Sequence, residues 1–90
     1  MLVIVAYDIP DDKRRKEIFR YLKDFGDPRL RSVFECWVNP STLSRLQREL
    51  AWMLETSEDS VRCYLLCEQC ERRVAAHHRR PPGYNGAVIL

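Results

Sequence analysis

One acidic side chain and a run of basic ones stand close together near the start of this 90-residue chain. The apolar residues 2–7 lead directly into Asp8, and the basic run 13–16 follows after two further acids. A short apolar run rich in β-branched residues is typical of a buried strand, which would place the Asp8 carboxylate at the mouth of a sheet. Magnesium prefers oxygen ligands and is often held by one or two carboxylates together with phosphate oxygens. The pattern therefore suits a divalent metal beside a phosphate-bearing partner, whereas the plain alternative is that Asp8 caps the following turn or helix.

The basic residues are grouped in the sequence, although the formal net charge is only +2. Arginine supplies twelve of the fifteen basic residues, and the clusters lie at 13–16, 29–31 and 72–80. Arginine is suited to bidentate phosphate contacts, and clustering is the usual footprint of a nucleic-acid-binding surface. Helical spacing places Arg14 and Arg15 beside the buried face of the first helix, at the end that follows the first strand. We therefore predict these two residues as phosphate contacts, against the alternative of a solvated surface of mixed charge.

The apolar periodicity predicts one domain in which strands and helices alternate. Ninety residues suffice for one hydrophobic core, so we expect a single domain over 1–90, with residues 79–86 as a proline- and glycine-containing hinge. The predicted strands cover 2–7, 29–38, 61–68 and 87–90, and the predicted helices cover 11–25, 41–54 and 70–78. This order corresponds to an α+β fold, the ferredoxin-like βαββαβ plan with an added C-terminal strand. Because an apolar edge left unpaired is a liability, we expect the C-terminal strand to pair across a homodimer.

Several side chains are expected to have structural roles. Alternation in the strand predicted over 29–38 divides its residues between two faces, with Leu30, Ser32, Phe34 and Cys36 on one and Arg29, Arg31, Val33 and Glu35 on the other. Phe34 and Tyr7 are expected to pack in the core and not to stack on a ligand. In the helix predicted over 41–54, Ser41 or Thr42 is the expected cap and Trp52 is expected to point outward.

Four cysteines lie on apolar stretches of the chain: Cys36, Cys63, Cys67 and Cys70. The N-terminal apolar run lacks the flanking basic segment and cleavage site of a signal peptide. The chain also has no run of about 18 apolar residues, which a membrane-spanning helix would need. The expected location is therefore the cytoplasm, where thiols stay reduced and are usually buried. The pair at 67 and 70 has zinc-ligand spacing and is followed by His77 and His78, but a single such pair is a weak signal and inert thiols are favoured.

Short motifs spread over most of the chain also stand at characteristic distances from one another. They are Val-Ala-Tyr-Asp-Ile at 5–9, Asp-Asp-Lys-Arg-Arg-Lys at 11–16, Ser-Val-Phe-Glu at 32–35 and Asp-Ser-Val-Arg at 59–62. In this combination they resemble the Cas2 family, the small CRISPR-associated proteins that partner the spacer integrase. Members of that family commonly carry Gln where this chain has Leu30, so no polar role is expected at this position.

The resemblance implies a homodimer of ferredoxin-like subunits, in which each C-terminal strand adds to the partner's sheet and both copies of Asp8 lie near the interface. It also implies a magnesium-dependent endonuclease for single-stranded RNA or double-stranded DNA. In CRISPR adaptation such a dimer forms the centre of the complex in which the integrase subunit inserts spacers. Asp8 would then be the metal ligand and catalytic residue, while Arg14, Arg15 and Arg31 would hold nucleic-acid phosphates.

Two other functions fit the same residues. One carboxylate per subunit is few for a metal nuclease, whereas phosphate contacts alone can supply affinity without reading a base sequence. A non-catalytic, nucleic-acid-binding scaffold for the integrase is therefore the main alternative. A ribonuclease toxin of related fold is a third.

Overall fold

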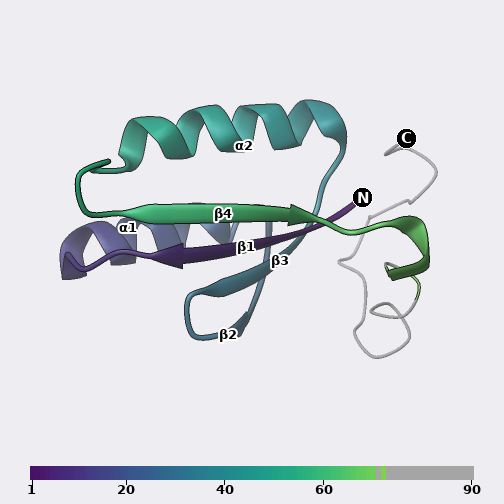
Figure 1. Ribbon diagram of the computed structural model, residues 1–90, viewed down its shortest axis with the longest axis horizontal. Coiled ribbons are helices and arrows are strands. Elements are labelled where there is room, and N and C mark those ends of the chain that lie inside the picture. The colour runs from purple at the N-terminus through teal and green to yellow at the C-terminus, as the bar shows by residue number, and fades with distance from the viewer. Residues whose placement is uncertain (71, 73–90) are drawn as a thin grey trace.

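The computed structural model describes residues 1–70 and 72 of the chain and arranges them as a sheet with two long helices (Figure 1). The elements in chain order are β1 (Leu2–Asp8), α1 (Asp12–Leu22), β2 (Gly26–Leu30), β3 (Val33–Trp37), α2 (Pro40–Met53) and β4 (Ser60–Leu65). This is the predicted βαββαβ order of a ferredoxin-like α+β fold. No helix in the described part is long and apolar enough to cross a membrane.

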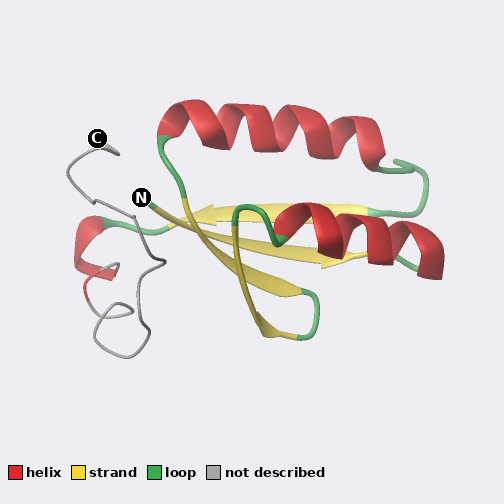
Figure 2. Ribbon diagram, turned by 180° about the vertical axis from the view of Figure 1, so that it is seen from behind, coloured by secondary structure: helices red, strands yellow, loops and turns green. Residues whose placement is uncertain are grey.

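The strands of the described part form one antiparallel sheet in the order β2-β3-β1-β4. Strand β1 is central, with β3 hydrogen-bonded on one side and β4 on the other. Both helices cover the same face of this sheet, as the view from behind in Figure 2 shows. Within the described residues, the opposite face therefore carries no helix and β4 forms one edge.

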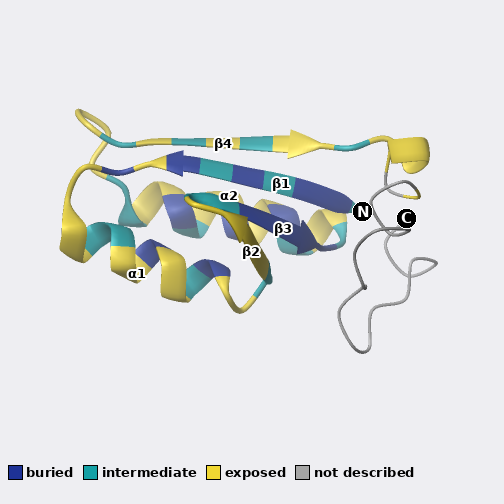
Figure 3. Cartoon of the chain, turned by 90° about the horizontal axis from the view of Figure 1, so that it is seen from below, coloured by how far each residue is buried: buried dark blue, intermediate teal, exposed yellow. Residues whose placement is uncertain are grey.

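The hydrophobic core lies between the helices and the sheet face that they cover. Alternate residues of β1 point into it, because successive side chains of a strand point to opposite faces. The buried residues of this core include Val3, Val5 and Tyr7 from β1, Phe34 and Cys36 from β3, Ile18 and Leu22 from α1, and Leu43, Leu46 and Leu50 from α2. Figure 3 shows that burial is greatest in the central strands β1 and β3, whereas the edge strands are largely exposed. The helical apolar spacing predicts most of these inner faces, including Ile18 and Leu22 of α1, but Phe19, which the same spacing places with them, is exposed.

Residues 29–38 do not form the single strand that their composition predicted. They comprise the end of β2, a turn at Arg31 and Ser32, and β3. Ser32 adopts a left-handed backbone φ of 63°, and its carbonyl accepts a hydrogen bond from the Tyr7 amide at 3.0 Å. Because the chain reverses here, Leu30 does not share the buried face of Phe34 but is 72% exposed. Arg31 consequently lies at the tip of a hairpin and not in the middle of a strand.

Helix α1 also ends earlier than predicted, at Leu22, and Gly26 begins β2 instead of stopping the helix. Glycine is required at this position, since a Cβ on Gly26 would approach the Glu35 carbonyl oxygen to 2.1 Å. Pro28 lies within β2, where its missing amide hydrogen is tolerated because β2 is at the edge of the sheet.

The remaining boundaries differ in smaller ways. Asn39, and not Ser41 or Thr42, caps α2, and its side-chain oxygen accepts a hydrogen bond from the Thr42 amide at 2.7 Å. Strand β4 ends at Leu65 and not near residue 68. The hinge predicted at 79–86 and the strand predicted at 87–90 lie outside the described residues, as does almost all of the helix predicted over 70–78.

Candidate nucleic-acid interface

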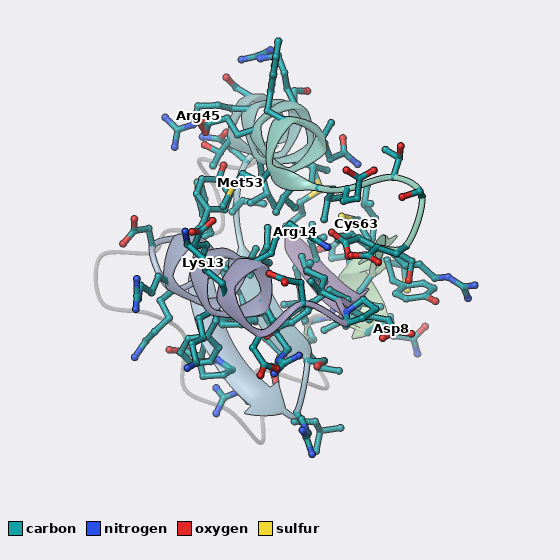
Figure 4. All side chains as sticks on the ribbon, turned by 90° about the vertical axis from the view of Figure 1, so that its left-hand side faces the viewer. Asp8, Lys13, Arg14, Arg45, Met53 and Cys63 are labelled. Atoms are coloured by element: carbon teal, nitrogen blue, oxygen red, sulfur yellow. The ribbon has the colours of Figure 1, made fainter. Side chains whose placement is uncertain are left out.

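Asp8 is the last residue of β1, and it is exposed. The buried residues before it hold the strand in the sheet, where Asp8 lies opposite Ser60, the first residue of β4. Figure 4 looks onto this end of the molecule and labels Asp8 and Arg14. Within the described part of the chain, no hydrogen bond or ion pair engages the Asp8 carboxylate. The carboxylate is therefore free to bind a ligand.

Arg14, one of the predicted phosphate contacts, is held by carboxylates of the same chain. Its Nε and Nη2 atoms donate to the two oxygens of Asp59 at 2.5 and 3.0 Å, and Nη2 also donates to Glu58. The side chain of Asp59 is fully buried, and the hydrogen bond from the guanidinium lowers the pKa of this carboxyl. Arg14 thus ties α1 to the segment that begins β4. Its role as a phosphate contact stays a prediction.

Arg15 is positioned by the loop between β1 and α1. Its Nη1 atom donates to the carbonyl oxygens of Ile9 at 3.0 Å and Pro10 at 3.4 Å, while Nη2 pairs with Asp12. The hydrogen bond from Arg15 lowers the pKa of Asp12. These contacts restrain the guanidinium at the wall of a neighbouring pocket.

That pocket has a volume of about 420 Å³ and opens between α1 and the β2–β3 turn. We call it the cationic pocket, and its lining residues are Tyr7, Arg15, Lys16, Phe19, Arg20, Leu30, Arg31 and Ser32. The lining contains four cationic side chains and no acidic one. The fold therefore brings together Arg15 and Arg31, two of the three predicted phosphate contacts, and leaves Arg14 outside.

Three cations of the cationic pocket have no hydrogen-bond or ion-pair partner among the described residues: Lys16, Arg20 and Arg31. Several other arginines are paired with carboxylates, as in Arg29–Glu35, Arg45–Glu49 and Arg72–Glu68. Uncompensated positive charge in a concave site attracts anions. Lys16 and Arg20 were not predicted as contacts. Their spacing of four residues puts them on one side of α1, but only the fold places the hairpin turn opposite them.

The cationic pocket also has an apolar wall. Phe19 is 37% exposed, and the edge of its ring system packs on Phe34 with the centroids 5.3 Å apart. Leu30 is far more exposed, whereas Tyr7 is buried, and this burial raises the pKa of its hydroxyl. Phe34 and Tyr7 are therefore packing residues, as predicted, and Tyr7 also lines the pocket.

Asp8 and the cationic pocket lie at the same end of the sheet but not on the same face. Tyr7 lines the pocket and directly precedes Asp8 in β1, so these two side chains point to opposite faces. The pocket lies on the face that the helices cover. A polymer can reach both places only by crossing the end of the sheet.

Comparison with known proteins connects this arrangement to a family. The family sequence model described as CRISPR associated protein Cas2 matches residues 1–74. The chain belongs to the Cas2 family.

Individual relatives agree with this assignment. A CRISPR-associated endoribonuclease Cas2 from Synechocystis is 43% identical over 65 residues, which are 72% of this chain and 71% of that protein. A CRISPR-associated endonuclease Cas2 from Thermus thermophilus is 40% identical over 70 residues, 78% of each protein. The crystal structure of Streptococcus pyogenes Cas2 at pH 6.5 gives a TM-score of 0.73 at 32% identity and covers 81% of this chain and 94% of that one. The predicted family and the ferredoxin-like order are both confirmed, and the curated relatives carry the names of nucleases.

The donor chemistry at Asp8 of this Cas2 family member fits magnesium. A carboxylate without a competing partner offers the oxygen ligands that this ion prefers. Within residues 1–70 and 72, no group of three or more His, Cys, Asp or Glu side chains could hold a metal ion. Magnesium does not need such a cage, since water and substrate phosphates complete its coordination. Asp8 is accordingly the residue of the candidate site that would hold the ion.

The cysteines of this Cas2 family member fall into two classes. Burial raises the pKa of Cys36 to about 12 and also raises the pKa of the half-buried Cys63. Cys67 and Cys70 are exposed, contrary to the prediction of buried thiols, because they lie beyond the end of β4. Hydrogen bonds from the amide and thiol of Cys70 lower the pKa of Cys67. The less favoured alternative, a zinc site that includes residues 77 and 78, involves positions outside the described part.

Proposed function

We propose that this protein is a magnesium-dependent endonuclease that hydrolyses phosphodiester bonds in single-stranded RNA, double-stranded DNA or both. It acts in the cytoplasm as a homodimer in CRISPR spacer acquisition, together with the integrase subunit. The observation that carries this proposal is Asp8, an exposed carboxylate without a partner in the described residues, at the sheet end that also holds the cationic pocket. The names of the Synechocystis and Thermus relatives, endoribonuclease and endonuclease, support it.

Asp8 and the arginines have different roles in the proposed hydrolysis. Asp8 would hold magnesium through its carboxylate oxygens. The chemistry that this ion would supply is polarisation of a phosphoryl oxygen and a more acidic attacking water. Arg15 and Arg31 bind phosphates of the strand on the helix-covered face and so hold it where it crosses the end of the sheet toward Asp8.

The homodimer is supported by the exposed surface of β4. This strand lies at the edge of the described sheet, and its residues Tyr64 and Leu65 are 48% and 54% exposed. The unpaired side of an edge strand readily accepts a strand from another chain. In the proposed dimer, the partner's residues 87–90 occupy that edge, and the second copy supplies a second Asp8 near the interface.

The decisive experiment compares cleavage by the wild type and by Asp8→Asn, which keeps the shape of the side chain and removes its charge. Labelled single-stranded RNA and duplex DNA are incubated with each protein, with and without Mg²⁺. Asp24→Asn, which changes an exposed acid beyond the end of α1, is the matched control. We expect the control to cleave like the wild type and Asp8→Asn to lose about 100-fold or more in rate, because the metal-binding carboxylate is gone.

Circular dichroism of the three proteins establishes that each is folded. Equal cleavage by the wild type and a folded Asp8→Asn protein would contradict the assignment of Asp8. A folded wild type that binds duplex DNA but cleaves neither substrate would contradict the nuclease.

The second candidate function is the non-catalytic scaffold of the integration complex. It is favoured because the candidate site offers one carboxylate per subunit, which is few for a metal nuclease, whereas the cationic pocket can bind phosphates without a metal. Spacer acquisition in cells separates the two functions. The scaffold predicts normal acquisition with Asp8→Asn, whereas a nuclease needed for adaptation predicts its loss.

A further inference from the structure

We propose that the cationic pocket binds one unstacked nucleotide of a single-stranded nucleic acid. The base lies against Phe19 and Leu30, and the phosphate is bound by Arg20 and Arg31. This inference deepens the proposed function and rests on it only for the statement that the bound strand is the nuclease substrate.

The charge of the pocket indicates an anionic ligand. Its lining contains four cations and no acid, and three of these cations make no hydrogen bond or ion pair within the described residues. Among the described residues outside the pocket, Arg14, Arg29, Arg45 and Arg72 are paired with carboxylates of the same chain. Three cations without a hydrogen bond or ion pair therefore surround one hollow, and the planar fork of arginine is suited to binding phosphate.

The apolar wall indicates that the ligand is more than a phosphate group. Leu30 is 72% exposed at the pocket, and Phe19 presents part of an aromatic ring. The Lys23 ammonium lies 5.7 Å from the centroid of the Phe19 ring, and Leu30 is open to water. A simple anion would leave Leu30 in water, whereas a nucleobase would cover Leu30 and the free part of Phe19 and gain the free energy of removing apolar surface from water. A volume of about 420 Å³ lies in the range of ordinary small-ligand pockets.

The concave shape favours a single strand over a duplex. Bases in a duplex are stacked and paired, so one of them could enter the pocket only after being extruded from the helix at a cost in free energy. The bases of a single strand are already accessible, and protein sites for such strands commonly combine cations with aromatic or apolar platforms. Because Tyr7 precedes Asp8, a nucleotide held here places the neighbouring part of its strand at the sheet end that carries the carboxylate.

The test measures binding in the absence of Mg²⁺, so that no strand is cleaved. Fluorescence anisotropy gives the dissociation constants of a labelled single-stranded RNA, a labelled single-stranded DNA and a labelled DNA duplex. The variants are Leu30→Ser, which alters a largely exposed side chain, and Phe19→Leu, which keeps apolar packing against Phe34 but removes the ring. Arg31→Gln removes one cation of the pocket, and Arg48→Gln on the exposed side of α2 is the matched control.

We expect Leu30→Ser and Phe19→Leu to weaken single-strand binding about tenfold without changing its salt dependence, because they remove base contacts. Their duplex binding should equal that of the wild type. Arg31→Gln should weaken single-strand binding and reduce the slope of log K against log salt by about 0.7, the value for one phosphate contact on a single strand. Arg48→Gln should match the wild type in every measurement.

Competition identifies which part of the ligand the pocket recognises. Uridine 5′-monophosphate should displace the single strand at a lower concentration than inorganic phosphate, and this advantage should disappear with Leu30→Ser. Equal displacement by both competitors, or equal loss of duplex and single-strand binding in the Leu30 variant, would overturn the nucleotide pocket.

Different results would contradict the nuclease proposal and the nucleotide-pocket proposal. If the wild type cleaves nucleic acid but Leu30→Ser and Phe19→Leu bind single strands normally, the pocket inference is wrong and the nuclease stands. If the wild type cleaves nothing but these variants selectively lose single-strand binding, the pocket inference stands as a property of a binding protein.

Discussion

Arg14 and Asp59 show how a charged side chain becomes part of the fold while its neighbours stay available to a ligand. The side chain of Asp59 has no exposed surface, although the residue as a whole is half-buried, and its oxygens accept hydrogen bonds from Arg14 and from the Glu55 amide at 2.9 Å. A carboxylate removed from water needs such partners, because an unpaired buried charge is strongly unfavourable. Arg14 is therefore required to balance the charge of Asp59 in the folded protein. By contrast, Arg31 in the cationic pocket forms no ion pair with a carboxylate among the described residues.

We predict that Arg14→Gln lowers the melting temperature by several degrees at pH 7, because it leaves the Asp59 carboxylate without its cation. The pKa of Asp59 lies below its ordinary value of 3.8 in the folded protein. The stabilisation is therefore complete above that value and is lost as the pH falls through the folded pKa. Thermal unfolding followed from pH 7 down to pH 3 should show the difference between the two proteins shrinking in acid.

Lys13→Gln is the matched control, since Lys13 is an exposed neighbour in α1. It should leave the melting temperature unchanged at both ends of the pH range. Identical unfolding of the wild type and Arg14→Gln at pH 7 would show that the contact with Asp59 does not stabilise the fold.

Thiol reactivity provides a second prediction at the level of residues. Cys67 should be alkylated by iodoacetamide first, because it is exposed and the hydrogen bonds from Cys70 lower its pKa. Cys36 should react only on unfolding, because it is buried and its pKa is raised to about 12. Mass spectrometry of peptides after timed labelling measures the order. Early labelling of Cys36 in the folded protein would contradict the position of β3 in the core.

At the level of elements, the β2–β3 hairpin determines where the cationic pocket lies. The hairpin brings Arg31 and Ser32 against the end of β1, while its edge strand carries Leu30 to the pocket. This geometry depends on the close approach of β2 to β3 at Gly26, where an added Cβ would meet the backbone of β3.

We predict that Gly26→Ala lowers the free energy of unfolding by roughly 1–3 kcal/mol, because the strands must separate to admit the methyl group. Urea unfolding measures this change, and Ser44→Ala on the exposed surface of α2 is the control. A weakened single-strand affinity is expected in the same variant, since the hairpin forms one wall of the pocket. Unchanged stability would mean that β2 pairs with β3 less closely than the structure indicates.

The hairpin could not be predicted from the sequence because its turn lacks the usual turn residues. Residues 29–38 contain no glycine, asparagine or proline at the turn itself, and the residue that adopts a positive φ is Ser32. Positive φ is uncommon outside glycine, asparagine and aspartate, so the local sequence carries no turn signal. By contrast, most of the inner face of each helix was predicted because its leucines and isoleucine recur at helical spacing, although Phe19 of the predicted α1 face is exposed.

At the level of the whole molecule, the described sheet is incomplete in two ways. One of its faces carries no helix within the described residues, and its edge strand β4 exposes Tyr64 and Leu65. Both features are expected of a subunit whose sheet meets a second copy, as the proposed homodimer requires.

We predict that Leu65→Arg raises the dissociation constant of the homodimer by about tenfold or more, since a charge on the docked edge opposes strand addition. Sedimentation velocity over a range of concentrations measures the change. Trp52→Arg is the control, because Trp52 is 86% exposed on α2, away from the sheet edge. A wild type that is monomeric throughout would contradict the dimer, and dissociation caused by Trp52→Arg alone would move the interface to α2.

The sequence by itself determined the central strand that ends in Asp8, the inner faces of both helices and the motifs of the Cas2 family. Each of these depends on residues close together in the chain, where strand and helix periodicity express the burial of apolar side chains. Only the tertiary structure decided which cationic side chains are available to bind an anionic ligand. Arg14 pairs with Asp59, 45 residues away, whereas Lys16 and Arg20 meet the hairpin turn of Arg31. Pairing and availability of charges depend on which surfaces the fold brings together, and local sequence patterns do not contain that information.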